Sequence, residues 1–231
     1  MTRTHSNDPV RIALIHALPH SVAPINEALM REWPQAMRMN LMDDSLSNDL
    51  ASNGRGLDVF MHERFMRLGD YAVDCGCDAI LFTCSAFGSC IEAVARKHAG
   101  MPVFKPNEAM IEDAVATGKS VGLLSSFPPT LASMPAEFPA SVKLICELAG
   151  GAMAALNVGD VATHDRLVLE SAVKLAAQGA GVIALAQFSM AHMRDAVAQK
   201  TGLPVLTTPD SAIRALRKRL NAAWHWGSNP N

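Results

Sequence analysis

The sequence predicts an α/β protein built from two pseudo-symmetric domains, each a parallel sheet between two layers of helices. Two observations predict this fold class. Apolar runs of strand type alternate with amphipathic helical segments along nearly the whole chain, a rhythm typical of parallel sheets covered by helices on both faces. The second half of the chain also repeats the first, because three blocks recur in the same order at an offset of about a hundred residues.

The repeated blocks align the strand ends of the two halves. Residues 11–21 match 120–130, residues 76–84 match 179–187, and residues 100–104 match 202–206. In this alignment Cys84 corresponds to Gln187. With 231 residues, 49% of them hydrophobic, the chain is long enough for two small cores. We therefore expect one domain at 10–112 with 207–225, a second domain at 113–206, and flexible tails at 1–9 and 226–231.

Strands and helices alternate in order through the first half. Pro34 ends the first helix, because proline lacks an N–H group and clashes inside a helix. The polar segment 43–49, which contains Asn48, is either a substrate-binding loop or a cap for the next helix. We expect strands at 11–17, 37–42, 78–83 and 102–104, and helices at 22–32, 57–75 and 85–99.

The second half is expected to follow the same plan. Strands are predicted at 120–124, 181–186 and 204–206 with a weaker one at 154–158, and helices at 133–149, 164–178 and 211–224. Ligands of such sheets bind beyond the carboxyl ends of the strands. Residues that directly follow a strand are therefore the candidate site residues.

Charge and cysteine content exclude several classes of function. The formal net charge of −2 gives no reason to expect nucleic acid or an anionic membrane as a partner. The five cysteines are odd in number, and Cys75 and Cys77 lie too close together for the usual zinc spacing, so we expect reduced thiols and no metal.

The chain offers neither a signal peptide nor about 18 uninterrupted apolar residues. A cytoplasmic protein is expected.

Cys84 is the strongest single candidate for chemistry. An apolar strand ends at this thiol, and a helical pattern begins directly after it. A sulfur at a helix start feels the positive end of the helix dipole, which lowers the pKa of a thiol and makes it a nucleophile or a base. The alternative is a small buried core residue, since free cysteine is among the most buried side chains.

Three segments together resemble the aspartate/glutamate racemase superfamily, which includes hydantoin racemases, maleate isomerases and arylmalonate decarboxylases. They are 78–88 around Cys84, 121–124 with the hydroxyl-rich loop that follows, and 202–206. The resemblance covers residues 11–217, and its most specific part is the turn at Thr83 and Cys84. It implies two similar α/β domains with the active site in the cleft between them. It also implies carbanion chemistry next to a carboxylate or carbonyl group, without metal or organic cofactor.

The chain departs from the racemising members of this superfamily at Gln187. Those members use two cysteines, one from each half, to remove and return the α-proton. An amide cannot exchange a proton near neutral pH, so the pair of Cys84 and Gln187 does not supply a two-thiol mechanism. A single thiol can still protonate an enolate left by decarboxylation, or add to an alkene and allow rotation. A carboxylate-binding or regulatory protein without catalysis is the alternative.

Neutral donors at the strand ends suit a carboxylate or a developing enediolate. Each of them is also a common helix cap or turn residue. His16 ends the first strand and is either an acid–base group opposite the thiol or a hydrogen-bonded structural residue. The expected partner is a small carboxylic acid, and a homo-oligomer is possible. The candidate binding residues are Ser85, Asn48, Ser125, Ser126, Thr130, Gln187, Phe188 and Ser189.

Overall fold

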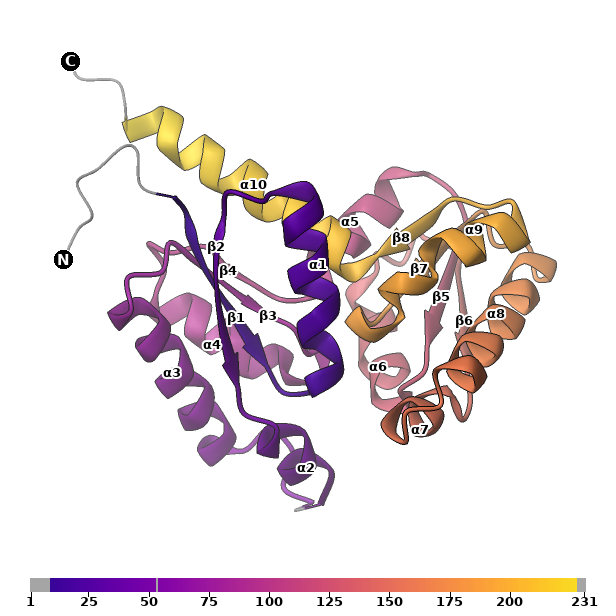
Figure 1. The fold of residues 1–231 in the computed structure, drawn as a ribbon, viewed down its shortest axis with the longest axis horizontal. Coiled ribbons are helices and arrows are strands. Elements are labelled where there is room, and N and C mark those ends of the chain that lie inside the picture. Colours follow the sequence, from indigo (N-terminus) through magenta and orange to yellow (C-terminus); the bar gives the residue numbers. More distant parts are fainter. Residues whose placement is uncertain (1–8, 53, 228–231) are drawn as a thin grey trace. The chain divides into compact units, whose positions relative to one another are not determined.

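The computed structural model describes residues 9–52 and 54–227, which form two compact α/β units (Figure 1). The first unit comprises Met1–Pro106 with Ala212–Asn231, and the second comprises Asn107–Ser211. Each contains a four-stranded parallel sheet. The predicted fold class of two parallel α/β units is confirmed. Most of the two predicted tails, 1–8 and 228–231, lies outside the described residues.

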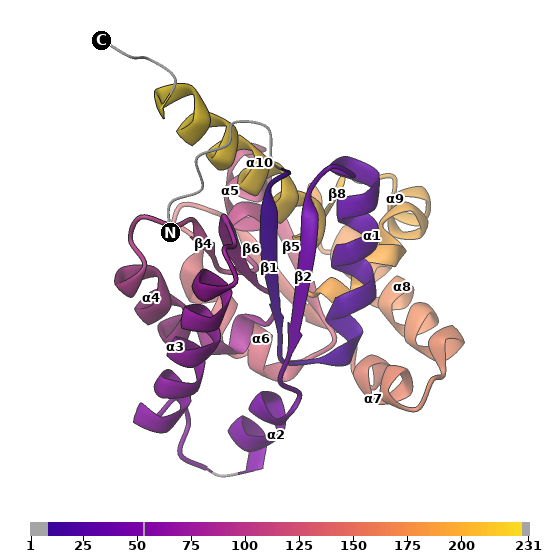
Figure 2. The same cartoon turned by 60° about the vertical axis from the view of Figure 1, so that its left-hand side comes forward.

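The sheet of the first unit has the strand order β2-β1-β3-β4. Ala13, Ile15 and Phe82 on one of its faces join the core under α3 and α4, and α1 lies on the opposite side (Figure 2). The elements of this unit are β1 Arg11–His16, η1 Pro19–Ser21, α1 Val22–Glu32, β2 Met37–Met42, α2 Ser45–Ser52, α3 Val59–Asp74, β3 Ala79–Phe82, η2 Ser85–Phe87, α4 Gly88–Lys97 and β4 Val103–Phe104.

The core of the first unit depends on a close approach of α3 and α4. Phe65 of α3 stacks on Phe82 of β3, with ring centroids 5.3 Å apart, and lies 4.8 Å from the ring of Phe87. A Cβ atom added at Gly69 would lie 2.6 Å from Cγ1 of Val94. Glycine at position 69 therefore sets how closely these two helices pack.

The second unit repeats the topology with the strand order β6-β5-β7-β8. α8 and α9 cover a core on one face that contains Leu124 and Leu185, and α5 covers a second core that contains Leu123 and Val182. Its elements are α5 Glu108–Ala116, β5 Val121–Ser125, α6 Pro128–Ser133, η3 Met134–Glu137, β6 Leu144–Leu148, α7 Ala152–Asn157, α8 Val161–Ala177, β7 Val182–Leu185, η4 Phe188–Met193, α9 Arg194–Thr201 and β8 Val205–Thr207, and α10 Thr208–Gly227 begins in it.

Three sequence-based assignments of elements are wrong. The helix predicted at 133–149 is instead η3, a loop and β6, because Pro135 and Pro139 prevent a continuous helix and the next residues pair with β5. The weak strand predicted at 154–158 is the helix α7, which follows Gly151 at a φ of 84°. The segment expected as a loop or cap at 43–49 runs into a helix of its own, α2.

Among the described residues, no helix combines the length and the apolar character that a membrane crossing needs.

Candidate active site

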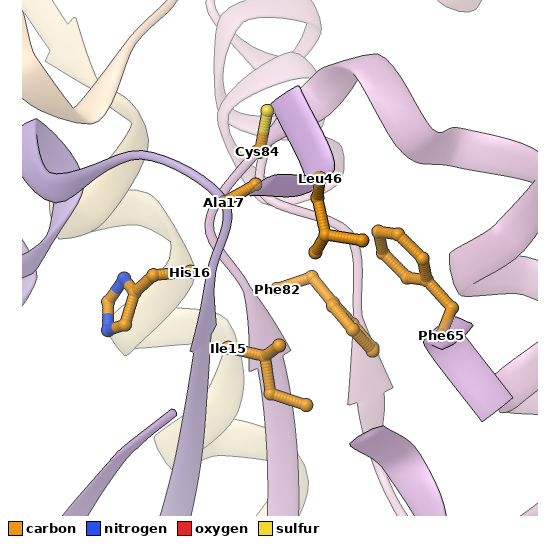
Figure 3. Close-up of a pocket in the computed structure, with 7 residues that line it drawn as sticks. All are labelled: Ile15, His16, Ala17, Leu46, Phe65, Phe82 and Cys84. Carbon is orange, nitrogen blue, oxygen red and sulfur yellow. The ribbon is translucent and has the colours of Figure 1, made fainter. Parts of the chain in front are cut away.

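The carboxyl end of β3 holds Cys84 beside a narrow, mostly apolar pocket (Figure 3). β3 is buried along its whole length, since Ala79–Phe82 lie in the core. The chain then leaves the sheet in an extended conformation at Cys84, with φ −126° and ψ 122°, and enters η2. The sulfur points away from the strand. Leu46 of α2 and Phe65 of α3 line the pocket. The pocket is lined by Ile15, His16, Ala17, Leu46, Phe65, Phe82 and Cys84.

The backbone N–H of Ala86 and the hydroxyl of Ser47 both act on the Cys84 thiol so as to lower its pKa. Burial raises the pKa of the Cys84 thiol, and the two donors lower it by less than burial raises it. The lowered pKa expected from the helix start is therefore wrong for the protein without a ligand. Only the short η2 follows the sulfur directly, and α4 begins four residues later, at Gly88.

His16 is fully buried, and both of its ring nitrogens have partners. Nε2 lies 3.0 Å from Oδ1 of Asn40, which also accepts from Asn26, so Nε2 carries the proton. Nδ1 then accepts from the hydroxyl of Thr83 at 2.9 Å, and the Ser21 hydroxyl, 3.0 Å from Nδ1, donates to the carbonyl oxygen of Leu18. Burial lowers the pKa of His16, and the Asn40 hydrogen bond opposes this. The ring points to the other side of β1 from the pocket (Figure 3), and it holds the strand end that precedes Cys84.

In the second unit, Gln187 occupies the position after β7 that corresponds to Cys84. Its Oε1 accepts three hydrogen bonds, from the backbone N–H of Ser126 at 2.6 Å, the Ser126 hydroxyl at 2.9 Å and the Ser125 hydroxyl at 3.0 Å. Because a backbone N–H can only donate, these bonds fix which end of the amide is the oxygen. The amide NH₂ group has no partner among the described residues. Gln187 thus offers two N–H donors at the edge of this sheet.

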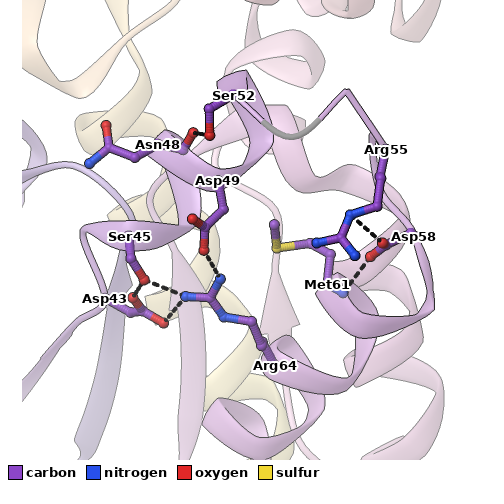
Figure 4. Close-up of polar contacts among 9 residues, drawn as sticks. All are labelled: Asp43, Ser45, Asn48, Asp49, Ser52, Arg55, Asp58, Met61 and Arg64. Carbon is purple, nitrogen blue, oxygen red and sulfur yellow. Dashed lines mark hydrogen bonds and ion pairs between the residues drawn. The ribbon is translucent and has the colours of Figure 1, made fainter.

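The remaining predicted binding residues lie on the elements that follow the strands. Ser85 is in η2 beside Cys84, whereas Phe188 and Ser189 are buried in η4 directly after Gln187. Thr130 is buried in α6. Asn48 is on α2, and its side chain points away from the Arg64 contacts (Figure 4). The structure brings Ser125, Ser126 and Gln187 into direct contact, and it puts Ser85 next to Cys84.

Arg64 of α3 binds α2 and the turn before it through ion pairs (Figure 4). Its guanidinium contacts Asp49 at 2.5 Å and Asp43 at 2.7 Å, so it joins α2 to the turn that precedes it. Hydrogen bonds from Ser45 and Arg64 lower the pKa of Asp43 although its partial burial acts in the opposite direction. Because Ser47 lies between these anchor points, the ion pairs hold its hydroxyl near the thiol.

Ser47 and Arg64 were not identified from the sequence. Ser47 belongs to the polar segment 43–49, but only its place on the first turn of α2 shows that it acts on the thiol. Arg64 is one of several charged residues on an amphipathic helix. No pattern in the sequence distinguishes it from the others.

Comparisons with known proteins agree with this arrangement. The sequence of residues 25–216 matches the family model of the Asp/Glu/Hydantoin racemases. The fold is similar to a glutamate racemase from Bacillus anthracis, with a TM-score of 0.73, 11% identity, and 94% of this chain and 84% of that chain covered. A glutamate racemase from Francisella tularensis in complex with D-glutamate has a TM-score of 0.69 and 15% identity over 94% and 82% of the two chains.

An arylmalonate decarboxylase mutant is also similar, with a TM-score of 0.63 and 19% identity over 90% of this chain and 92% of that chain. At these identities the structural likeness shows the fold. No curated protein matches the chain in sequence. The family model, in contrast, spans most of the chain, and the resemblance inferred from the residues around Cys84 is confirmed. The chain belongs to the Asp/Glu/Hydantoin racemase family and is an enzyme of the racemase and isomerase type.

Proposed function

We propose that this enzyme acts, without a cofactor, at the carbon next to a carboxylate or carbonyl group of a small carboxylic acid, with Cys84 as the group that exchanges a proton with that carbon or adds to it. The observation that carries the proposal is the setting of the thiol. It follows a buried strand, and the backbone N–H of Ala86 and the hydroxyl of Ser47 both favour the thiolate form of Cys84. Two donors on sulfur stabilise the thiolate as it forms. The D-glutamate bound to the similar racemase supports a small carboxylate as the substrate class.

Gln187 supports the same chemistry as a fixed donor. Three hydrogen bonds hold its oxygen, so its NH₂ group is ready to bind a carboxylate or the enediolate that develops from it. A donor that is oriented before the reaction needs no reorganisation in the transition state. An amide neither takes nor gives a proton at neutral pH, so its role in the proposal is binding.

The protonated state of Cys84 favours proton donation. Because burial raises the pKa of the thiol, Cys84 carries its proton in the enzyme without substrate. A thiol in this form can protonate a carbanion that arises by loss of CO₂ or of an α-proton. In this scheme His16 is a positioning residue, because its hydrogen bonds go to Thr83 and Asn40. The sequence-based expectations of a cytoplasmic location and a possible homo-oligomer belong to the same proposal.

The alternative of a carboxylate-binding protein without catalysis is not favoured by membership of a racemase family. A mass-spectrometric screen of small mono- and dicarboxylates for conversion decides between the two. We expect the wild-type protein to convert at least one of them, and Cys84→Ser to abolish turnover without changing the circular dichroism spectrum. Conversion by Cys84→Ala at the wild-type rate would remove Cys84 from the mechanism.

A further inference from the structure

Two histidines and one aspartate of the second unit bring their ligand atoms together at one place. Nδ1 of His164 lies 2.8 Å from Oδ1 of Asp165, and Nε2 of His192 lies 2.7 Å from the same oxygen. The three ligand atoms lie within 4.8 Å of one another. All three residues belong to the unit Asn107–Ser211, so the cluster is formed within one domain. The reaction proposed for Cys84 uses none of them.

Two packed elements hold these side chains in place. His164 and Asp165 are near the start of α8, whereas His192 is in η4. The two imidazole rings stack with centroids 5.5 Å apart, and Met190 and Met193 of η4 join the core that α8 covers. The His164 side chain is fully buried, so packing fixes the position of its ring nitrogens.

The carboxylate of Asp165 has no cationic side chain beside it. Its burial raises the pKa of Asp165, but hydrogen bonds from His164 and His192 lower it by more, so the group is ionised. Within the described part of the chain, these two histidines are its contacts, and no lysine or arginine makes an ion pair with it. Partly buried charges in proteins are usually paired or bound to metal ions. Asp165 is therefore in a position where a bound cation would supply the missing positive charge.

A second contact between a histidine and a carboxylate shows the contrast. In the first unit, Nε2 of His98 lies 2.9 Å from Oδ1 of Asp70. There the ammonium group of Lys97, 2.7 Å from the same carboxylate, supplies the positive charge. At Asp165 a second imidazole takes the place of the lysine. The cluster around Asp70 is thus complete by itself, whereas the cluster around Asp165 offers two nitrogens and an oxygen to an ion.

The ligand types suit zinc. Imidazole nitrogen together with carboxylate oxygen binds zinc and related transition metals, whereas magnesium and calcium prefer oxygen ligands. The exposed fractions of the Asp165 and His192 side chains are 33% and 43%, so an ion can reach them from solvent. Bonds of about 2.0–2.1 Å to a tetrahedral ion separate its ligands by about 3.3 Å, so Asp165 has to move back by about 0.5 Å.

A purely hydrogen-bonded contact between α8 and η4 is the alternative, because two N–H groups that donate to one oxygen also bring these atoms together. Nε2 of His164 has no hydrogen-bond partner in the described chain, and this holds with or without an ion. The charge on Asp165 therefore favours the ion. Metal-bound histidines usually donate their second N–H group to an oxygen. Because Nε2 lacks such an acceptor, we expect an exchangeable ion that EDTA removes.

We propose that Nδ1 of His164, Nε2 of His192 and the carboxylate of Asp165 bind one zinc ion, which cross-links α8 to η4. Water fills the remaining position of the tetrahedral ion. The inference goes beyond the function proposed above and does not depend on it, since no step at Cys84 passes through the ion. The expectation of no metal came from the cysteines, and these ligands are not thiols. Because η4 begins directly after Gln187, the ion should fix the segment that follows this amide donor.

Calorimetric titration of the EDTA-treated, full-length protein with zinc chloride tests the site, with magnesium chloride as the comparison. We expect the wild type to bind one zinc ion per chain and no magnesium. His192→Gln and Asp165→Asn change partly exposed side chains, and each should weaken zinc binding by about 10–100-fold or more, since loss of a supporting contact alone has an effect of this size. His98→Gln is the matched control, because it removes a histidine–carboxylate contact outside the site, and it should keep the wild-type affinity.

Two further measurements locate the ion. Zinc should raise the Tm of the wild type and of His98→Gln but not that of His192→Gln, and it should slow amide hydrogen exchange in α8 and η4. With Co²⁺ as the probe, the wild type should show the visible absorption of a four-coordinate ion. The near-ultraviolet band of a cobalt–thiolate bond should be absent.

Three outcomes would overturn the proposal. Equal zinc affinity in His192→Gln and the wild type would show that the ion binds elsewhere. Loss of zinc binding in Cys84→Ser, together with a cobalt–thiolate band in the wild type, would assign the ion to the thiol. A wild type that binds no zinc, with unchanged hydrogen exchange in α8 and η4, would leave the three side chains as a hydrogen-bonded contact between these elements.

Discussion

At the scale of the residue, the environment of Cys84 combines opposite influences on one sulfur. Burial favours the neutral thiol, whereas the N–H of Ala86 and the hydroxyl of Ser47 favour the thiolate. The sequence pattern predicted only the second influence, because it revealed a helix start but not how much of the side chain the fold covers. The balance produces a thiol that holds its proton in the absence of substrate.

Ser47 should contribute measurably to the acidity of this thiol. In Ser47→Ala one of two donors is lost, and a hydrogen bond to a charged group is worth about 1.5–3 kcal/mol. We expect the pKa of Cys84 to rise further above its ordinary value and alkylation by iodoacetamide at pH 8 to slow accordingly. The control is Ser52→Ala, because the Ser52 hydroxyl donates to the carbonyl oxygen of Asn48 on the same helix and to no other described residue. Equal alkylation rates in both variants would show that Ser47 does not act on the sulfur.

At the scale of the element, α2 depends on a few ionic contacts for its position. Only Leu46 of this short helix is buried. Arg64 bonds to Asp43, Ser45 and Asp49, and these contacts supply much of what fixes α2 to α3 (Figure 4). Because partly exposed ion pairs stabilise little, their effect should be local.

Arg64→Met should loosen α2 with little loss of global stability. We expect a decrease of about 1 kcal/mol or less in the free energy of unfolding, together with faster amide hydrogen exchange in residues 45–52 and slower alkylation of Cys84. Arg55→Met is the matched control, since Arg55 pairs with Asp58 3.4 Å away and is more exposed. Unchanged exchange at 45–52 would mean that Leu46 alone holds the helix.

The contact between α3 and α4 should be intolerant of a single methyl group. Gly69→Ala would put a Cβ atom 2.6 Å from the γ-methyl of Val94, a branched side chain that cannot swing away freely. We expect a loss of about 1–3 kcal/mol in urea denaturation. The double variant Gly69→Ala with Val94→Ala should recover part of it. A Gly69→Ala protein as stable as the wild type would show that the two helices separate without cost.

At the scale of the whole molecule, the internal repeat predicted two parallel α/β units and placed Cys84 and Gln187 at equivalent strand ends. Local sequence patterns predict the wrong element where pairing with a distant strand determines the structure. An example is β6, which pairs with β5 although the sequence pattern of this stretch favours a helix. The hydroxyls of Ser125 and Ser126 were predicted to bind a substrate, yet in the structure they orient the amide of Gln187. The position of Ser47 near the thiol could not be predicted, because it depends on distances that a single sequence does not contain.

The stability of the first unit should fall as the pH drops below about 6.5. Burial lowers the pKa of His16 in the folded protein, so the unfolded chain takes up the proton first as the pH falls through about 6.5. The stabilisation is fully present above that pH and is lost as the pH falls toward the folded-state pKa. In His16→Gln the free energy of unfolding should lose this dependence on pH. The difference in free energy of unfolding between the wild type and the variant should therefore be smaller at pH 5.5 than at pH 7.5. Urea denaturation at several pH values measures it, with His62→Gln as the control, since the His62 ring is partly exposed and bonds only to a carbonyl oxygen one turn away. A wild-type stability that stays constant over this range would mean that His16 titrates alike in the folded and unfolded chains.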